Sequence, residues 1–255
     1  MLTILSPAKN LDFETIPCTR HASQPEFVEA SSELVGLLRP MTAQQLGKLM
    51  QISPRLAELN QRRYQQWQPR FEAGPCKQAL LAFAGEVYVG LEAASLSEAD
   101  LLHAQQHLRI LSGLYGLLRP LDLIHPYRLE MGTPLANPHG RDLYHFWGDR
   151  ITDALNRQLG GSGVLINLAS QEYFKAVQPK RLAGRLITPQ FKDYKGGTYR
   201  TIGLLAKRAR GAMARAIILN RWERPDALKT FDWQGYRFNA ELSSATEWVF
   251  SRRQA

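Results

Sequence analysis

The chain has 255 residues, of which 44% are hydrophobic and 22% are charged, and its formal net charge is +9. This is the composition of an ordinary soluble globule, and no apolar run approaches the length of a bilayer-spanning helix. Two cysteines, Cys18 and Cys76, make neither a disulfide framework nor a zinc set. The N-terminal residues lack the flanks of a signal peptide, so we expect a cytoplasmic protein with no membrane partner.

The positive charge is concentrated in the second half of the chain. Residues 1–150 are close to neutral, whereas residues 175–224 hold 13 Lys and Arg against two acids, Asp193 and Glu223. A concentrated positive field attracts polyanions and speeds their encounter. Nucleic acid is the first candidate partner, and phosphorylated small molecules are the second. The alternative is a solvated basic face that binds nothing.

The first residues predict the start of an α/β fold. Residues 2–5 are typical of a short buried strand, and a turn rich in Ser, Pro, Asn and Asp follows at 6–12. In this turn Lys9 and Asp12 could bind an anion and orient a proton, or could simply form an Asx-type turn. An amphipathic helix is expected from Pro25 to a stop at Arg39 and Pro40.

Residues 42–64 predict two helices joined by a tight turn. Thr42 suits the N-cap of the first helix, and Pro54 suits the first turn of the second. The arrangement resembles a helix-hairpin-helix DNA-binding unit, in which glycines flank a central apolar residue and backbone N–H groups hold a phosphate. Gln51 and Ser53 occupy those glycine positions around Ile52, so the match is partial. A plain helical pair is the alternative.

The segment that follows predicts two strands and a helix. Residues 78–83 and 86–89 are strand-like on either side of Gly85, and Ser97 suits the N-cap of a helix from Glu98 to about Ile110. His103 and His107 share a face of this helix, at a spacing that a metal could use. No third strong ligand stands out beyond Asp100, so we expect no metal site and no cofactor.

Residues 112–132 form an apolar stretch that glycines and prolines interrupt. Four charged residues lie among its leucines: Arg119, Asp122, Arg128 and Glu130. Charges in an apolar segment must be paired or reach solvent, because an isolated buried ion is very costly. The stretch is therefore either an irregular connection that lines a central cleft or a cluster of ion pairs with a purely structural role.

The second half predicts more strands and one basic helix. Residues 164–169 are a strong strand signal, and they place Asn167 near the edge where α/β clefts lie. Residues 185–191 and 198–205 predict a hairpin, and the aromatic tail predicts closing strands. Residues 207–221 predict a helix with an alanine-rich start that allows close approach, either by a DNA backbone or by the protein's own sheet.

Four motifs, at residues 6–12, 111–132, 166–175 and 207–211, together resemble the YaaA family of peroxide stress-response proteins. The resemblance covers essentially the whole chain, and Asn10 stands where the family more often has threonine. It implies an unusual α/β fold with a helix-hairpin-helix element and binding to duplex DNA. It also implies a role in limiting peroxide damage in the bacterial cytoplasm, partly through less free iron.

The expected fold class is therefore α/β, a single domain over residues 1–255. It should contain a mixed sheet with surrounding helices and a helix-hairpin-helix element at about 42–64. The first functional hypothesis is a stress-response protein that binds double-stranded DNA independently of sequence. About 5 neutralised phosphates would give a slope of log K against log[salt] near −4 to −5. The phosphate contacts would be Lys48, Arg55, Arg62, Arg63, Lys207, Arg208, Arg210 and Arg215.

The second hypothesis is an enzyme that acts on a phosphate-bearing or nucleotide-like small molecule in a central cleft. Lys, Tyr and Glu at strand ends could transfer protons if burial shifted their pKa values. No nucleophile–base pair or metal set stands out, so the sequence names no reaction. The residues expected to line this cleft are Lys9, Asp12, Tyr115, Arg128, Glu130, Glu172, Tyr173 and Lys175.

Overall fold

A mixed sheet lies at the centre of the computed structural model, which describes residues 1–71, 74–160 and 163–253. Its strand order is β11-β12-β9-β8-β1-β5-β6, and β10 pairs with β9 outside this path. Five strands pair in parallel: β1 (Leu2–Leu5), β5 (Leu108–Ser112), β8 (Val164–Asn167), β9 (Arg185–Lys195) and β12 (Glu247–Arg253). Three pair only in antiparallel fashion: β6 (Gly116–Leu118), β10 (Thr198–Arg200) and β11 (Arg237–Asn239). The predicted mixed α/β fold is confirmed.

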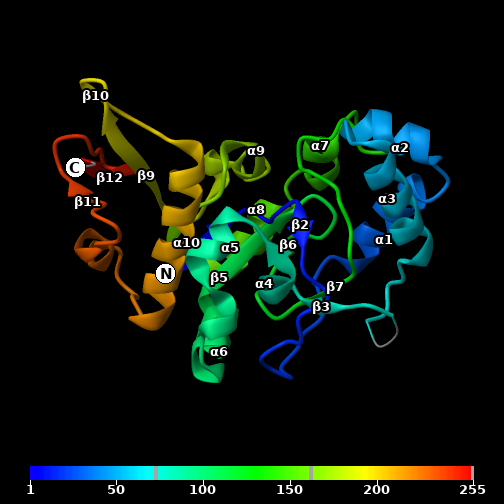
Figure 1. Cartoon of the computed structure of the whole chain (residues 1–255), viewed down its shortest axis with the longest axis horizontal. Coiled ribbons are helices and arrows are strands. Elements are labelled where there is room, and N and C mark those ends of the chain that lie inside the picture. The colour runs from blue at the N-terminus through cyan, green and yellow to red at the C-terminus, as the bar shows by residue number, and fades with distance from the viewer. Residues whose placement is uncertain (72–73, 161–162, 254–255) are drawn as a thin grey trace.

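Helices cover the sheet because parallel strands bury both of their faces. All residues of β1 and β5 are buried. Figure 1 shows three helices side by side in front of the sheet: α5 (Glu86–Leu91), α6 (Glu98–His107) and α10 (Gly203–Leu219). Also present are α8 (Arg150–Leu159), which packs on β6, and the short α9 (Gln171–Phe174). No helix of the described residues is both long and apolar enough to cross a membrane.

A second group of helices lies at the far end of the long axis from β9 and β12 (Figure 1). It comprises α1 (Val28–Leu38), α2 (Ala43–Met50), α3 (Pro54–Gln66) and α7 (Leu143–Trp147). The two predicted helices at 42–64 and the turn between them are confirmed. Thr42 Oγ1 accepts from the Gln45 N–H at 3.2 Å, and Gln45 Oε1 accepts from the Thr42 N–H at 2.8 Å. This capping box fixes the start of α2.

The predicted strands at 78–83 and 86–89 are wrong. Strand structure is limited to β3 (Lys77–Gln78) and β4 (Phe83–Ala84), with helix α4 (Ala79–Ala82) between them. β3 pairs with β7 (Leu123–Ile124), and β4 pairs with β2 (Asn10–Leu11). The second predicted strand is helix α5, because tertiary packing against α10 overrides the local preference for strand. Helix α6 also ends three residues early, at His107, where β5 begins beside β1.

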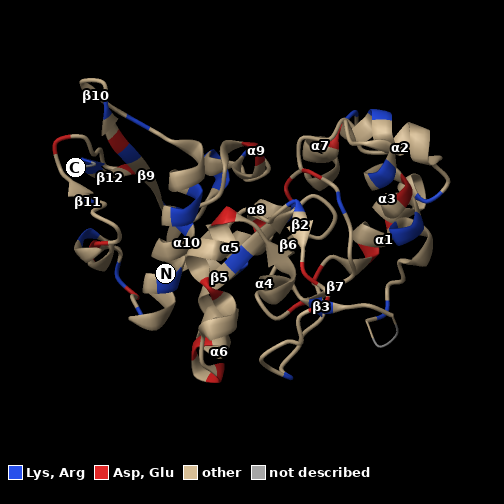
Figure 2. Ribbon diagram, in the orientation of Figure 1, with Lys and Arg blue, Asp and Glu red and all other residues tan. Residues whose placement is uncertain are grey.

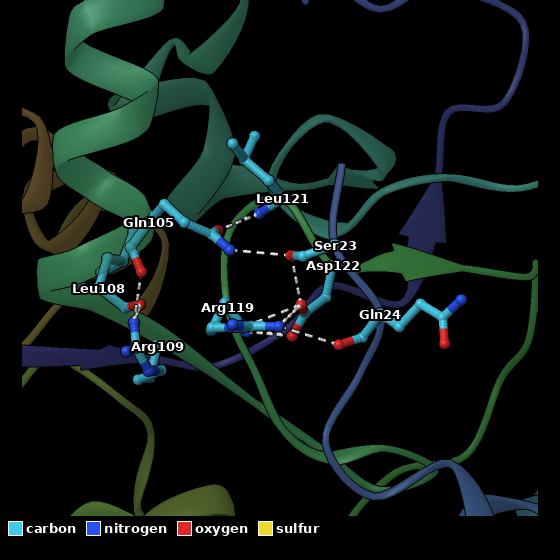
Figure 3. Close-up of polar contacts among 8 residues, drawn as sticks. All are labelled: Ser23, Gln24, Gln105, Leu108, Arg109, Arg119, Leu121 and Asp122. Atoms are coloured by element: carbon cyan, nitrogen blue, oxygen red, sulfur yellow. Dashed lines mark hydrogen bonds and ion pairs between the residues drawn. The ribbon is translucent and has the colours of Figure 1, made fainter. Parts of the chain in front are cut away.

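The stretch at 112–132 contains a cluster of polar contacts, which Figure 3 shows. The Arg119 guanidinium lies 3.0 Å from Asp122 Oδ1, and the Ser23 hydroxyl donates to the same oxygen at 2.6 Å. Gln105 donates to Ser23 Oγ at 2.8 Å and so connects α6 to this cluster. Burial raises the pKa of Asp122, and the contacts from Ser23 and Arg119 oppose that shift. For Arg119 and Asp122, the alternative of a structural cluster of ion pairs is therefore confirmed.

The later predictions are largely confirmed. The strand at 164–169 is β8, and the hairpin at 185–205 is β9 and β10, although residues 203–205 already belong to α10. The basic helix begins at Gly203 rather than at 207. The aromatic tail was expected to form closing strands, and it forms β11 and β12.

Candidate functional site

A cleft of about 840 Å³ opens at the carboxyl ends of the parallel strands. β5 lies on one side of β1 and β8 on the other, and the chain continues from β8 to β9, away from β1. The sheet order therefore reverses between β1 and β8. Ligands of open α/β sheets bind at such a switch point, because the loops after the two strands diverge there. Both of these loops, residues 6–10 and 167–174, line the cleft.

Hydrogen bonds hold the two loops together at the base of the cleft. The Ser170 N–H donates to Ser6 Oγ at 2.8 Å, and the Ser6 hydroxyl donates to Ser170 Oγ at 3.2 Å. Tyr88 of α5 donates its hydroxyl to the Ser6 carbonyl at 3.0 Å. Burial raises the pKa of Tyr88 well above its ordinary value, so this tyrosine remains a donor at neutral pH.

Four of the predicted cleft residues line the cleft: Lys9, Glu130, Glu172 and Tyr173. Glu130 binds Lys9 Nζ at 3.0 Å through one oxygen and Arg128 Nη2 at 2.9 Å through the other. Glu172 Oε1 accepts from the Gly132 N–H at 3.0 Å. Burial raises the pKa of Tyr173, and the charges of Glu172 and Glu130 raise it further. Both predicted carboxylates are therefore already engaged by the protein.

The other four predicted cleft residues lie outside the lining. Tyr115 is fully buried and accepts from Trp67 Nε1 at 2.9 Å. Arg128 lies behind the lining and pairs with Glu130, which does line the cleft. Lys175 is exposed, and its Nζ lies 4.5 Å from the centre of the Tyr144 ring. Asp12 forms the Asx-type turn that the sequence left open, since its Oδ1 accepts from the backbone N–H groups of residues 14 and 15.

Replacing Asp12 with alanine should destabilise the protein at neutral pH and have little effect in acid. The hydrogen bond from the Thr15 backbone lowers the pKa of Asp12, with a smaller contribution from Lys77, which lies 3.3 Å away. A carboxyl with a depressed pKa stabilises the fold above its unfolded pKa, and this stability is lost as the pH falls. We expect the melting temperature to drop by about 2–4 °C at pH 7.

Thermal unfolding followed by circular dichroism over a pH series would measure this difference. The gap between wild type and Asp12→Ala should close as the pH falls below about 4, where the unfolded carboxyl is protonated. Glu14→Gln is the matched control, because Glu14 is an exposed acid in the same turn. A gap that stays constant with pH would show that the charge of Asp12 has no part in the effect.

The eight basic residues predicted to contact DNA separate into two groups. Lys48, Arg55 and Arg62 are exposed on α2 and α3, and Arg63 beside them is partly buried. The others lie on α10, in a different part of the molecule along its long axis (Figures 1 and 2). The eight residues therefore do not form one continuous trough.

The four residues on α10 have different surroundings. Lys207 and Arg210 line the cleft. Arg208 pairs with Glu86 of α5, and Arg215 donates to the carbonyls of Leu91 and Glu92 at 3.0 and 3.1 Å. Arg208 and Arg215 therefore tie α10 to α5, which leaves Lys207 and Arg210 as the two of these four cations that face the cleft.

Sequence reasoning missed the polar residues that β9 and α5 contribute to the cleft. Thr188 and Gln190 of β9 both line it, as do Glu86 and Tyr88 of α5. The alternation at 188 and 190 was a usable signal, because residues two apart in a strand point to the same face. No signal placed α5 there, since it was predicted to be a strand.

Within the described residues, no group of three or more His, Cys, Asp or Glu side chains could hold a metal ion.

Comparison with known proteins agrees with the resemblance seen in the motifs. Residues 1–242 match the model of a family described as "Peroxide stress protein YaaA". A UPF0246 protein of Paraburkholderia phytofirmans is 56% identical over 99% of each chain, and one of Paraburkholderia xenovorans is 56% identical over 100% of each. A UPF0246 protein of Cellvibrio japonicus is 54% identical over 100% of this chain and 99% of its own. With nearly its whole length matched, the chain belongs to the peroxide stress protein YaaA family.

Proposed function

We propose that this protein serves the peroxide stress response by binding duplex DNA through its backbone phosphates, and so limits oxidative damage to the DNA. The contact surface is the hairpin of α2 and α3. Its exposed cations carry the proposal: within the described residues Lys48, Arg55 and Arg62 form no ion pair, so their charges are available to phosphates. Arg55 and Arg62 are seven residues apart, so they lie two turns apart on one face of α3. Figure 2 shows basic residues along α3 and on α2.

The backbone of the turn supports a helix-hairpin-helix function for these helices. Gln51 has a φ of 52°, in the left-handed region that glycine adopts most readily. The turn thus has at Gln51 a conformation that a glycine would supply in a helix-hairpin-helix unit. Helix α3 follows directly; Pro54 has no N–H and the Leu56 N–H donates to Ser53 Oγ, so the Arg55 N–H and the helix dipole favour a phosphate there.

The double variant Arg55→Gln/Arg62→Gln should weaken duplex binding and flatten its salt dependence. Three phosphate contacts give a slope of log K against log[salt] of about −3 for the wild type, because each contact contributes about −0.9. This is shallower than the slope of about −4 to −5 for about 5 neutralised phosphates, since Arg208 and Arg215 of α10 bond to α5 and Lys207 and Arg210 face the cleft. Removing two contacts should bring the slope to about −1. Fluorescence anisotropy with a labelled duplex at several salt concentrations would measure it.

Two further variants make this test specific to the hairpin. Glu58 lies between Arg55 and Arg62 on the exposed face of α3, so Glu58→Gln should tighten duplex binding. Arg224→Gln removes an exposed cation at a distance from the hairpin and should leave the affinity unchanged. A wild-type affinity that does not respond to salt, or an unchanged slope in the double variant, would refute phosphate contact through this surface.

A further inference from the structure

The cleft holds two cations that pair with no acidic group of the described residues. Lys207 and Arg210 lie three residues apart on α10, so they share a helix face, and both line the cleft. Among residues 1–71, 74–160 and 163–253, neither side chain forms an ion pair or a hydrogen bond. Arg208, which lies between them in sequence, pairs with Glu86 instead. The helix thus presents two uncompensated charges to the cleft.

Arg210 is the more informative of the two cations. Lys207 is exposed and keeps its hydration, whereas Arg210 is partly buried. Loss of hydration lowers the pKa of the Arg210 guanidinium, and no neighbouring acid opposes that shift. Removing a cation from water without a counter-charge costs free energy. An anion bound in the cleft would offset this cost.

The acids of the cleft do not supply that anion, because each has another partner. Glu86 binds Arg208, Glu130 binds Lys9, and Glu172 accepts from a backbone N–H. The wall near β8 and β9 also carries neutral polar side chains. It includes Asn167 and Thr188, whose side chains lie 3.4 Å apart, and Gln190. Hydroxyl and amide groups of this kind recognise the hydroxyls of a ligand.

We propose that the cleft binds the phosphate ester of a small hydroxylated molecule, with the phosphate on Arg210 and Lys207 and the body of the molecule against Asn167, Thr188 and Gln190. A guanidinium suits this anion, because it can donate two parallel hydrogen bonds to a phosphate. The cleft volume of about 840 Å³ lies within the range of about 300–1,000 Å³ that is usual for small-molecule sites. This site is separate from the α2–α3 hairpin and does not depend on DNA binding.

Isothermal titration of the full chain with inorganic phosphate, ribose 5-phosphate and adenosine monophosphate tests the proposal. We expect at least one of the two esters to bind saturably and more tightly than inorganic phosphate. Arg210→Gln should weaken ester binding by about 10- to 100-fold, the usual effect of losing a charge-assisted contact. Lys207→Gln should weaken it less, because that side chain is exposed. Affinity should fall between about pH 7.5 and 5.5, as the phosphate takes up its second proton.

The hairpin supplies a matched control that separates this proposal from DNA binding. Arg62→Gln removes an equal charge and should leave ester binding unchanged, while Arg210→Gln should leave the salt slope of duplex binding unchanged. Near-UV circular dichroism checks that Arg210→Gln is folded, and Lys207→Gln tests the same site without touching a buried residue. The proposal is overturned if neither ester binds at millimolar concentration, if both folded variants bind as well as wild type, if inorganic phosphate binds as tightly as the esters, or if duplex DNA displaces the ester.

Discussion

Replacing Gly211 with alanine should destabilise the protein by about 1–3 kcal/mol, the usual cost of overpacking a close contact. A Cβ at this position would lie 1.8 Å from the Val87 carbonyl oxygen and 2.9 Å from the Leu91 backbone nitrogen. Because these are backbone atoms, no change of rotamer relieves the overlap, and α5 and α10 must separate. Alanine gains about 1 kcal/mol over glycine in a helix interior, and the overlap outweighs this gain. Urea denaturation measures the difference.

Gly90 provides a second test of the same interface. Its Cβ would lie 2.1 Å from the Arg208 carbonyl oxygen, so Gly90→Ala should also destabilise. One separation of the two helices relieves both overlaps, so the double variant should cost less than the sum of the single variants. Gly203→Ala is the control, since nothing lies within 4 Å of that Cβ position on the same helix. If Gly211→Ala were as stable as Gly203→Ala, the distance between α5 and α10 would not be limited by contact at the glycines.

The close packing of α5 and α10 also shows what the sequence could and could not predict. Small residues at the start of the basic helix predicted the close approach of another surface, and this is confirmed. The candidates were a DNA backbone and the protein's own sheet; α10 does contact β9 of the sheet, and its closest approach is to α5. Residues 86–91 include Val87, Tyr88 and Val89, which favour a strand when considered alone. They pack as a helix against Gly211, which lies more than 100 residues further along the chain, and local patterns do not reveal that contact.

Strands and caps with strong local signals were predicted well. β1 and β8 are short and apolar, and the N-caps Thr42 and Ser97 each form a capping box. The boundary at Leu108 was missed, because no glycine or proline separates α6 from β5. The apolar residues of β5 continue the pattern of the helix, so the change of conformation comes from pairing with β1. Such a boundary is set by the sheet and is absent from the local sequence.

The candidate site was predicted in part for a similar reason. Strand ends are visible in a sequence, and they correctly indicated Lys9, Asn167, Glu172 and Tyr173 as residues of the cleft. The surroundings of neighbouring basic residues are not visible. Arg208 and Arg210 are two positions apart, yet one pairs with Glu86 and the other faces the cleft. A count of charges therefore predicted an anionic partner without separating the cations that face it from those that join helices.

Replacing Arg252 with methionine should destabilise the protein by about 3–5 kcal/mol, the range observed when one partner of a buried ion pair is removed. Arg252 of β12 lies beside Asp193 of β9, and its Nε is 2.6 Å from Asp193 Oδ1. The side chains are 9% and 1% exposed, so among the described residues the variant leaves the buried carboxylate with the Tyr236 hydroxyl as its one side-chain donor. Methionine fills much of the same volume, so most of the loss measured by urea denaturation should come from the uncompensated charge.

The double variant Asp193→Leu/Arg252→Met separates the charge from the packing. With both ions removed, no charge is left unpaired in the interior, so the double variant should be more stable than Arg252→Met alone. Arg237→Met is the exposed comparison, because Arg237 pairs with Asp232 at 2.8 Å with side chains that are 75% and 48% exposed. Water screens that pair, and its loss should cost no more than about 1 kcal/mol. If the double variant were instead no more stable than Arg252→Met, the loss in the single variant would come from the packing and other contacts of Arg252, and not from an unpaired buried carboxylate.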